Sequence, residues 1–132
     1  MTKEELLQHA FEAMEHAYVP YSHYRVGACV LLRDGVIVKG ANIENASFGL
    51  TNCAERSALF AAYSAGYRKQ DIKALAIVSE GAYLAAPCGA CRQVIVELME
   101  EDTPIYLSNG KEVVSTTIKE LLPMSFTEKD VL

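Results

Sequence analysis

Residues 52–99 read NCAERSALFAAYSAGYRKQDIKALAIVSEGAYLAAPCGACRQVIVELM, and this stretch decides the class of fold. Its first part, Cys53 to Ala65, is rich in alanine and apolar residues and predicts a helix with Asn52 as its N-cap. Ile72 to Ser79 is a continuous apolar run of strand length, which predicts a buried strand. A further helix is expected from Cys88 or Gly89 to Met99. This order of helix, buried strand and helix is typical of crossover connections in a layered α/β domain.

The flanking sequence extends the same alternation. Lys3 to about Tyr18 carries apolar residues at helical spacing and predicts an amphipathic helix. The runs Val26–Leu32 and Val36–Ile43 lie on either side of Asp34-Gly35, a strong hairpin signal, and predict two antiparallel strands. The last expected elements are two short strands and a short helix, at Pro104–Leu107, Glu112–Ser115 and Thr117–Leu122.

Length and composition indicate one globular domain. A chain of 132 residues is enough for one core and too short for two, so we expect a single domain over residues 1–132. With 51% hydrophobic and 22% charged residues, the chain is neither disordered nor fibrous. Its excess of apolar residues favours burial against further copies of the chain.

Charge and hydropathy exclude two classes of partner, polynucleotides and membranes. Twelve Lys and Arg residues against 17 Asp and Glu residues give a net charge of −5, and no basic run occurs. A polynucleotide held by its phosphates is therefore not expected, because that affinity rests on clustered basic residues. No apolar run approaches the ~20 residues of a membrane span, and the first residues do not resemble a signal peptide. We expect a soluble, cytoplasmic protein with no membrane partner.

The cysteines are the first candidates for chemistry. Cys53, Cys88 and Cys91 all fall at predicted helix starts, where unpaired N–H groups favour the thiolate form. If the two crossover helices share a face of the sheet, the three sulfurs converge and can bind one Zn²⁺. Three protein ligands leave a coordination position open, which is typical of catalytic and not of structural zinc. Cys29, on an alternating strand, is expected in the core.

Two charged residues follow Cys53. Glu55 lies about 200° around a helix from Cys53, so it is poorly placed as a ligand and better placed to lean over the open position. A carboxylate there can accept a proton from water and donate it to a leaving group. Arg56 can donate to the sulfurs and offset the net −1 charge of three thiolates around Zn²⁺.

These motifs resemble a known family. Asn52-Cys53-Ala54-Glu55-Arg56 followed by Pro87-Cys88-Gly89-Ala90-Cys91-Arg92-Gln93 is similar to the zinc-dependent nucleoside deaminases, specifically the small homotetrameric cytidine deaminases. The resemblance covers nearly the whole chain. It continues in Tyr21-Ser22-His23-Tyr24-Arg25-Val26-Gly27-Ala28, Gly40-Ala41-Asn42-Ile43-Glu44-Asn45-Ala46 and Glu120-Leu121-Leu122-Pro123.

The resemblance implies a fold and an activity. The fold is a three-layer α/β/α sandwich with a five-stranded mixed sheet. The activity is hydrolytic deamination of cytidine and deoxycytidine to uridine and deoxyuridine, with release of ammonia, by zinc-activated water in pyrimidine salvage. The enzyme would be a cytoplasmic homotetramer with shared active sites.

The resemblance also implies roles for individual residues. Cys53, Cys88 and Cys91 would bind Zn²⁺, with Glu55 as the proton shuttle. Asn42 and Glu44 would bind a ribose hydroxyl, and Ala54 would contact the pyrimidine through its backbone. Tyr24 and Phe126 would pack on the nucleoside, with Phe126 supplied by a neighbouring subunit.

Two positions depart from the family pattern. Tyr24 stands where the family often has Phe, which adds a hydroxyl at the rim of the site. Phe48 stands where the family usually has Tyr, which removes a hydroxyl near the 5′ end of the ribose. Both changes concern substrate preference and not the chemistry.

Other interpretations stay open at this level. A deaminase of the same fold can act on a nucleoside-like antibiotic such as blasticidin S, although Asn42 and Glu44 favour a ribose. A non-catalytic structural-zinc or redox C-x-x-C protein is the alternative from another class. Taken singly, Glu55 is also consistent with a dipole-favoured acid at a helix start, and Arg56 with a surface ion pair.

Overall fold

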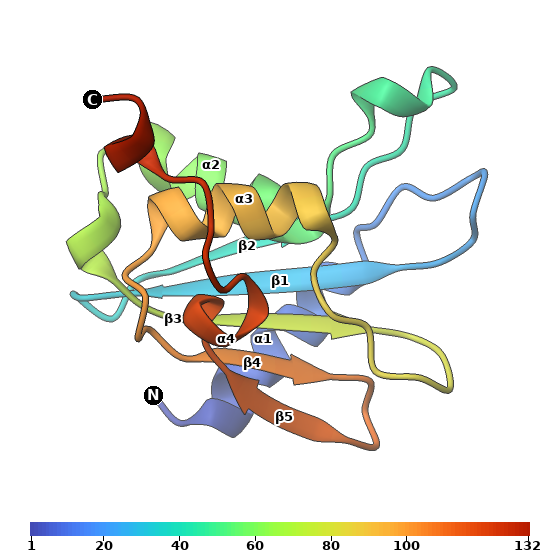
Figure 1. The fold of residues 1–132 in the computed structure, drawn as a ribbon. Coiled ribbons are helices and arrows are strands. Elements are labelled where there is room, and N and C mark those ends of the chain that lie inside the picture. Colours follow the sequence, from blue (N-terminus) through green and yellow to red (C-terminus); the bar gives the residue numbers. More distant parts are fainter.

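A five-stranded sheet carries helices on both faces in the computed structural model, which describes residues 1–132 (Figure 1). β1 pairs antiparallel with β2 and β3, β3 runs parallel to β4, and β4 pairs antiparallel with β5. The predicted mixed sheet of five strands is therefore confirmed. In the spatial order β2-β1-β3-β4-β5, the strands span Ile37–Ala41, Val26–Leu32, Ile72–Ser79, Ile105–Ser108 and Val113–Thr116.

The helices form the outer layers. α1 (Lys3–Met14) packs on one face, and α2 (Ala54–Ser64), α3 (Gly89–Leu98) and α4 (Ile118–Leu121) lie on the other. The three-layer α/β/α arrangement is confirmed. None of these helices has the length and apolar character needed to cross a membrane. Short 3₁₀ turns occur at Phe48–Leu50, Lys69–Asp71 and Glu128–Asp130.

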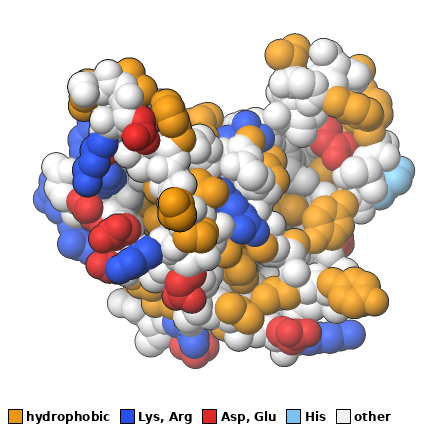
Figure 2. Space-filling view, in the orientation of Figure 1, with side chains coloured by type: hydrophobic (Ala, Val, Ile, Leu, Met, Phe, Trp, Pro, Cys, Tyr) orange, Lys and Arg blue, Asp and Glu red, His pale blue; other side chains and the backbone are white.

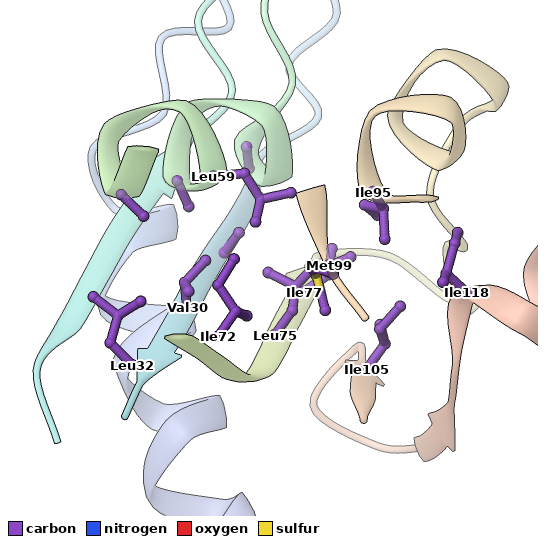
Figure 3. Close-up of a cluster of buried hydrophobic side chains, with 14 of the residues drawn as sticks. Val30, Leu32, Leu59, Ile72, Leu75, Ile77, Ile95, Met99, Ile105 and Ile118 are labelled. Carbon is purple, nitrogen blue, oxygen red and sulfur yellow. The ribbon is translucent and has the colours of Figure 1, made fainter. Parts of the chain in front are cut away.

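The two faces of the sheet bury separate apolar clusters. Leu75 and Ile77 of β3 point toward α2 and α3 and belong to the larger cluster, which Figure 3 shows. Ala76 and Val78, which alternate with them, face α1 in the smaller cluster. Cys29 also lies in the smaller cluster, as the alternation of β1 predicted, and burial raises the pKa of its thiol to about 11. Strand alternation thus assigns each side chain to one layer.

Element boundaries differ from the sequence predictions at two places that matter for the site. α1 ends at Met14 and not near Tyr18, because Tyr18 forms a backbone bridge with Ile43. The N-cap of α2 is Cys53 and not Asn52, so that prediction is wrong. The physical reason is that Asn52 exchanges backbone hydrogen bonds of 3.0 Å with Ile43 and is held in extended pairing.

The connections bring two helix starts to one edge of the sheet. β2 and β3 both run antiparallel to β1, so they are parallel to each other and end at the same edge. α2 follows β2, α3 follows β3, and both helices cover the same face. Their N-termini are therefore neighbours at this edge, which is also where β1 begins.

Glycines on the sheet let the helices approach very closely. A Cβ on Gly40 of β2 would lie 2.6 Å from both the Ala54 carbonyl oxygen and the Ala58 nitrogen in α2. A Cβ on Gly27 of β1 would lie 2.2 Å from the Ala10 carbonyl oxygen in α1. No side chain fits at either contact, so backbone packs directly on backbone. The absence of a side chain at Gly40 therefore sets the distance between the first turn of α2 and the sheet.

We predict that Gly40→Ala lowers the free energy of unfolding by about 1–3 kcal/mol, the usual cost of overpacking a tight contact. Thermal or urea denaturation measures the change. Gly49→Ala is the matched control, because a Cβ there meets nothing within 4 Å, and it should change stability by less than about 0.5 kcal/mol. Equal stability of Gly40→Ala and wild type would contradict this account of the α2 contact.

Candidate metal centre and active site

Three cysteine sulfurs meet where α2 and α3 begin. Cys53 is the N-cap of α2, Cys88 is the N-cap of α3, and Cys91 lies in the first turn of α3. Their Sγ atoms all lie within 4.8 Å of one another. Sulfurs at tetrahedral positions around one zinc ion, with bonds of about 2.3 Å, lie about 3.8 Å apart. Small side-chain adjustments therefore allow all three sulfurs to bind one ion.

Local hydrogen bonds hold the segment that carries two of these cysteines. The Cys91 backbone N–H donates to Cys88 Sγ at 3.4 Å, as expected for an N-cap side chain. Arg92 Nε donates to the Pro87 carbonyl oxygen at 2.7 Å, and Arg92 Nη1 donates to the Leu121 carbonyl oxygen at 2.7 Å. Arg92 thus ties the turn before α3 to the end of α4.

The electrostatics favour the thiolate form at Cys53. Hydrogen bonds from Cys91 and from Arg56 lower the pKa of Cys53 to about 5 against the effect of burial. The pKa of Cys91 is raised, because its thiol donates to the Cys53 sulfur and is buried. Arg56 Nη2 lies 3.1 Å from Cys53 Sγ, and its buried Nε has no hydrogen-bond partner. Soft sulfur donors beside a guanidinium fit Zn²⁺, whose thiolate complex carries excess negative charge.

A cavity of about 260 Å³ opens beside the sulfurs. It brings together seven residues singled out from the sequence, and Cys91 lies just behind them with its side chain buried. The predicted residues on its wall are Tyr24, Asn42, Glu44, Cys53, Ala54, Glu55 and Cys88. The remaining lining residues are Ser22, Val26, Ile77, Ala85 and Ala86.

None of these five additional residues was predicted as a site residue from the sequence. Ala85 and Ala86 directly precede Pro87, so their position before the cysteine motif was a usable signal. Ser22 lies inside the opening motif, next to Tyr21. Val26 and Ile77 looked like ordinary strand residues, and only the pairing of β1 with β3 brings them to the cavity.

Glu55 lies in the first turn of α2 with 4% of its surface exposed. Burial raises the pKa of its carboxyl group, and the negative charge of Cys53 raises it further. The side chain lines the same cavity as Cys53 and Cys88. A carboxyl group whose proton affinity is raised in this way is suited to accept and return a proton.

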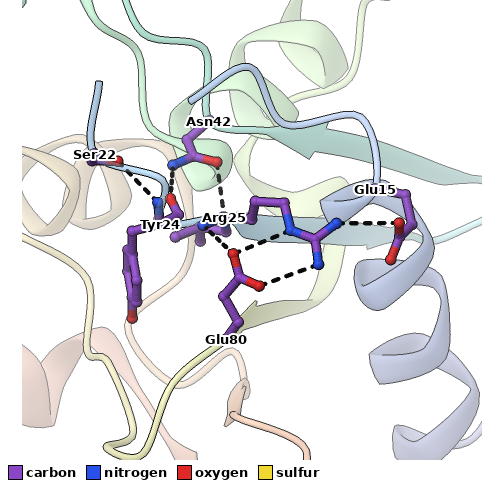
Figure 4. Close-up of polar contacts among 7 residues, drawn as sticks. Glu15, Ser22, Tyr24, Arg25, Asn42 and Glu80 are labelled. Atoms are coloured by element: carbon purple, nitrogen blue, oxygen red, sulfur yellow. Dashed lines mark hydrogen bonds and ion pairs between the residues drawn. The ribbon is translucent and has the colours of Figure 1, made fainter. Parts of the chain in front are cut away.

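Asn42 and Glu44 are fixed by the chain segment before β1. Asn42 Oδ1 accepts from the Val26 N–H at 2.9 Å, and Nδ2 donates to the Tyr24 carbonyl oxygen at 2.8 Å (Figure 4). Glu44 Oε1 accepts from the backbone N–H groups of Tyr21 and Ser22, both at 3.1 Å, and the pKa of Glu44 is lowered first by the Ser22 side chain and then by these backbone bonds. Each side chain keeps hydrogen-bonding capacity, because Asn42 has a second amide N–H and the two oxygens of a carboxylate can accept about four hydrogen bonds.

The structure places Phe48 and Phe126 outside this cavity. Phe48 packs edge-on against Tyr21 in a neighbouring hollow of about 350 Å³, which shares Ser22 and Glu44 with the cavity. Phe126 is 62% exposed, and its carbonyl oxygen accepts from Gln93 Nε2 at 2.8 Å. Phe126 therefore does not contact the site of its own chain.

Comparisons with known proteins agree with this chemistry. A family model, the cytidine and deoxycytidylate deaminase zinc-binding region, matches residues 1–107. A cytidine deaminase from Halalkalibacterium halodurans is 52% identical over 132 residues, which cover 99% of this chain and 98% of the relative. The crystal structure of a cytidine deaminase from Burkholderia pseudomallei matches with a TM-score of 0.92 at 46% identity, covering 96% of this chain and 100% of that chain.

A more distant relative bears on the alternative substrate. A blasticidin-S deaminase from Bacillus cereus is 32% identical over 130 residues, which cover 93% of this chain and 91% of the relative. Its identity is well below that of the Halalkalibacterium protein over a similar length.

We predict that Arg56→Ala binds Zn²⁺ about 10–100-fold more weakly than wild type, because the thiolates lose a charged hydrogen-bond donor. Competition with a chromogenic chelator measures the affinity, and wild type should hold about one Zn²⁺ per chain, as three thiolate ligands imply. Arg56→Gln, which donates without charge, should recover part of the affinity.

Arg68→Ala serves as the control for this experiment. Arg68 follows the C-terminal end of α2, whereas the sulfurs lie at its N-terminal end. Its guanidinium donates to the carbonyl oxygens of Tyr63 and Tyr67. Its removal should leave the zinc affinity unchanged. Unchanged affinity in Arg56→Ala would show that Arg56 does not support the metal centre.

Proposed function

Because this chain belongs to the cytidine and deoxycytidylate deaminase family, it is a zinc-dependent aminohydrolase that converts cytidine to uridine, and we propose that Glu55 carries the protons of this reaction. The observation that supports the proposal is the placement of one buried carboxyl group in the cavity that two of the three cysteines line. The same assignment extends to deoxycytidine, and the catalytic unit is the single domain of residues 1–132.

The mechanism assigns one role to the metal and several to the chain. Cys53, Cys88 and Cys91 would hold Zn²⁺, which would act as a Lewis acid and make a water molecule more acidic. Glu55 accepts a proton from the attacking water and donates one to N3 of the pyrimidine. It then accepts a second proton from the hydroxyl group added at C4, which becomes the carbonyl group of uridine, and donates this proton to the amino group, which leaves C4 as ammonia. Arg56 neutralises part of the thiolate charge while these steps occur.

The remaining cavity residues orient the nucleoside. The second amide N–H of Asn42 and the remaining acceptor capacity of the Glu44 carboxylate bind a ribose hydroxyl. The backbone of Ala54, between Cys53 and Glu55, meets the base, and the Tyr24 ring closes one wall. Apart from Ser22, the rest of the wall is apolar, which excludes water from the base; it is formed by Val26, Ile77, Ala85 and Ala86.

Substrate assays separate the two candidate deaminases. Purified protein, with its zinc quantified, is assayed spectrophotometrically with cytidine, deoxycytidine, CMP, cytosine and blasticidin S. We expect the highest kcat/KM for the two nucleosides, since Asn42 and Glu44 provide donors and acceptors for a sugar. Turnover of blasticidin S alone would assign the antibiotic deaminase instead, and no turnover with bound zinc would favour the structural-zinc alternative.

We further propose that the enzyme is a cytoplasmic homotetramer with shared active sites, acting in pyrimidine salvage. Large apolar side chains that are exposed in the single chain support the assembly: Phe48, Leu50 and Phe126 are 70%, 72% and 62% exposed. Figure 2 shows hydrophobic side chains on the lobe at the upper right, where Figure 1 places the 48–50 turn. Exposed apolar side chains that gather on one surface are typical of a contact with a partner.

We predict that Glu55→Gln loses about 10²–10⁴-fold in kcat while it keeps its fold and zinc, because an amide does not carry protons. Steady-state kinetics, circular dichroism and metal analysis test the three parts. The control is Glu97→Gln on the exposed side of α3, which should leave kcat unchanged. A kcat for Glu55→Gln within tenfold of wild type would assign the proton transfers to another group.

A mixing experiment tests whether Phe126 acts in a neighbouring subunit. Phe126→Ala and Glu55→Gln should each be weakly active alone. Mixed and reassembled, they should regain activity, because some sites then combine an intact Glu55 with an intact Phe126 of another chain. Light scattering should give the mass of a tetramer for wild type. No recovery on mixing, or a stable and active monomer, would contradict shared sites.

A further inference from the structure

We propose that Glu80 is a positioning residue for the substrate: through its contacts with Arg25 it sets the orientation of the Asn42 amide in the nucleoside cavity. The proposal rests on the function proposed above, because it assigns Asn42 to the sugar. Neither Arg25 nor Glu80 lines the cavity, so the effect is transmitted through the backbone next to Asn42.

Glu80 binds Arg25 through both backbone and side chain (Figure 4). Its Oε2 accepts from the Arg25 backbone N–H at 2.9 Å and from Arg25 Nε at 3.1 Å, and its Oε1 accepts from Nη2 at 3.2 Å. The Glu80 backbone N–H donates in turn to the Arg25 carbonyl oxygen at 3.4 Å. A two-point carboxylate–guanidinium contact restrains direction as well as distance. These bonds join the residue before β1 to the residue after β3.

The two neighbours of Arg25 hold the Asn42 side chain. The Tyr24 carbonyl oxygen accepts from Asn42 Nδ2 at 2.8 Å, and the Val26 N–H donates to Asn42 Oδ1 at 2.9 Å. In an extended chain, the hydrogen-bonding groups of successive residues point to opposite sides. Arg25 therefore bonds to Glu80 on one side, while Tyr24 and Val26 bond to Asn42 on the other. Any shift of the Arg25 backbone therefore moves both partners of the Asn42 amide together.

The charge state of the pair supports a persistent contact. Hydrogen bonds from Arg25 lower the pKa of Glu80, and those from Glu80 raise the pKa of Arg25. Glu15 of the turn after α1 also contacts Arg25, with Oε2 at 3.2 Å from Nη1. Glu15 touches only the outer end of the guanidinium and makes no bond to the backbone near Asn42. It provides a matched comparison, since its loss removes an ion pair from Arg25 without freeing the segment.

The role of Glu80 predicts a particular kinetic signature. Glu80→Ala should raise KM for cytidine about tenfold, because a misplaced binding group loses substrate affinity, while kcat stays within about twofold. Glu80→Gln keeps an acceptor oxygen and should recover part of the KM. Glu15→Gln should leave both constants unchanged. Zinc content should equal that of wild type in every variant, since no metal ligand is touched.

A double-mutant cycle tests whether Glu80 acts through Asn42. In an Asn42→Ala background, Glu80→Gln and Glu80→Ala should have little further effect on KM, because the side chain they misplace is gone. Additive effects on KM, or a KM in Glu80→Gln and Glu80→Ala equal to wild type, would overturn the proposal. If Glu80→Ala does not fold, Glu80→Gln alone carries the test, with an expected KM increase above threefold.

A failure of the proposed function and a failure of the role of Glu80 would give different results. If wild type itself does not deaminate cytidine, the proposed function fails before any variant is compared. If wild type is active and Glu80 variants change kcat instead of KM, the function stands and the positioning role of Glu80 is wrong.

Discussion

The close packing of α2 on the sheet is the constraint on which the site depends. Gly40 has no side chain between β2 and the Ala54–Ala58 turn, so the helix backbone rests directly on the strand there. The small side chains of α2, Ala54, Ala58 and Ala62, are fully buried beneath it. Cys53 and Glu55 belong to this same first turn. The position of Cys53 and Glu55 relative to the cysteines of α3 therefore depends on the Gly40 contact, which leaves no room for an additional atom.

The site places groups of opposite acid–base character within one short segment. Cys53 occupies the N-cap position of α2, receives hydrogen bonds from Cys91 and Arg56, and has a lowered pKa. Glu55, two residues later, is buried and has a raised pKa. Helix ends and donors stabilise a thiolate, whereas an apolar wall disfavours a carboxylate. One turn of helix therefore holds a thiol with a lowered pKa and a carboxyl group with a raised pKa, which suits the metal-binding and proton-carrying roles proposed for Cys53 and Glu55.

The nucleoside side of the cavity is built differently, from segments that have no helix to support them. Its polar groups come from the end of β2 and the stretch before β1, and backbone hydrogen bonds hold them in place. The Arg25–Glu80 pair closes this arrangement from the far side, where β3 ends. These two parts of the cavity are joined where β2 ends, because Ile43, next to Asn42, exchanges backbone hydrogen bonds with Asn52, next to Cys53.

The sequence by itself determined the local elements and the chemical identity of the site. Apolar periodicity located β1 and β3 to the residue, and the spacing of Cys88 and Cys91 with Glu55 after Cys53 indicated a metal and a proton carrier. It did not show that Asn52 is held by Ile43 and leaves the cap to Cys53, nor that Val26 and Ile77 line the cavity. Those features depend on strand pairing between residues far apart in the chain, which local patterns do not encode. Only the tertiary structure decided them, because the order β2-β1-β3 brings the ends of three strands and the starts of two helices to one edge.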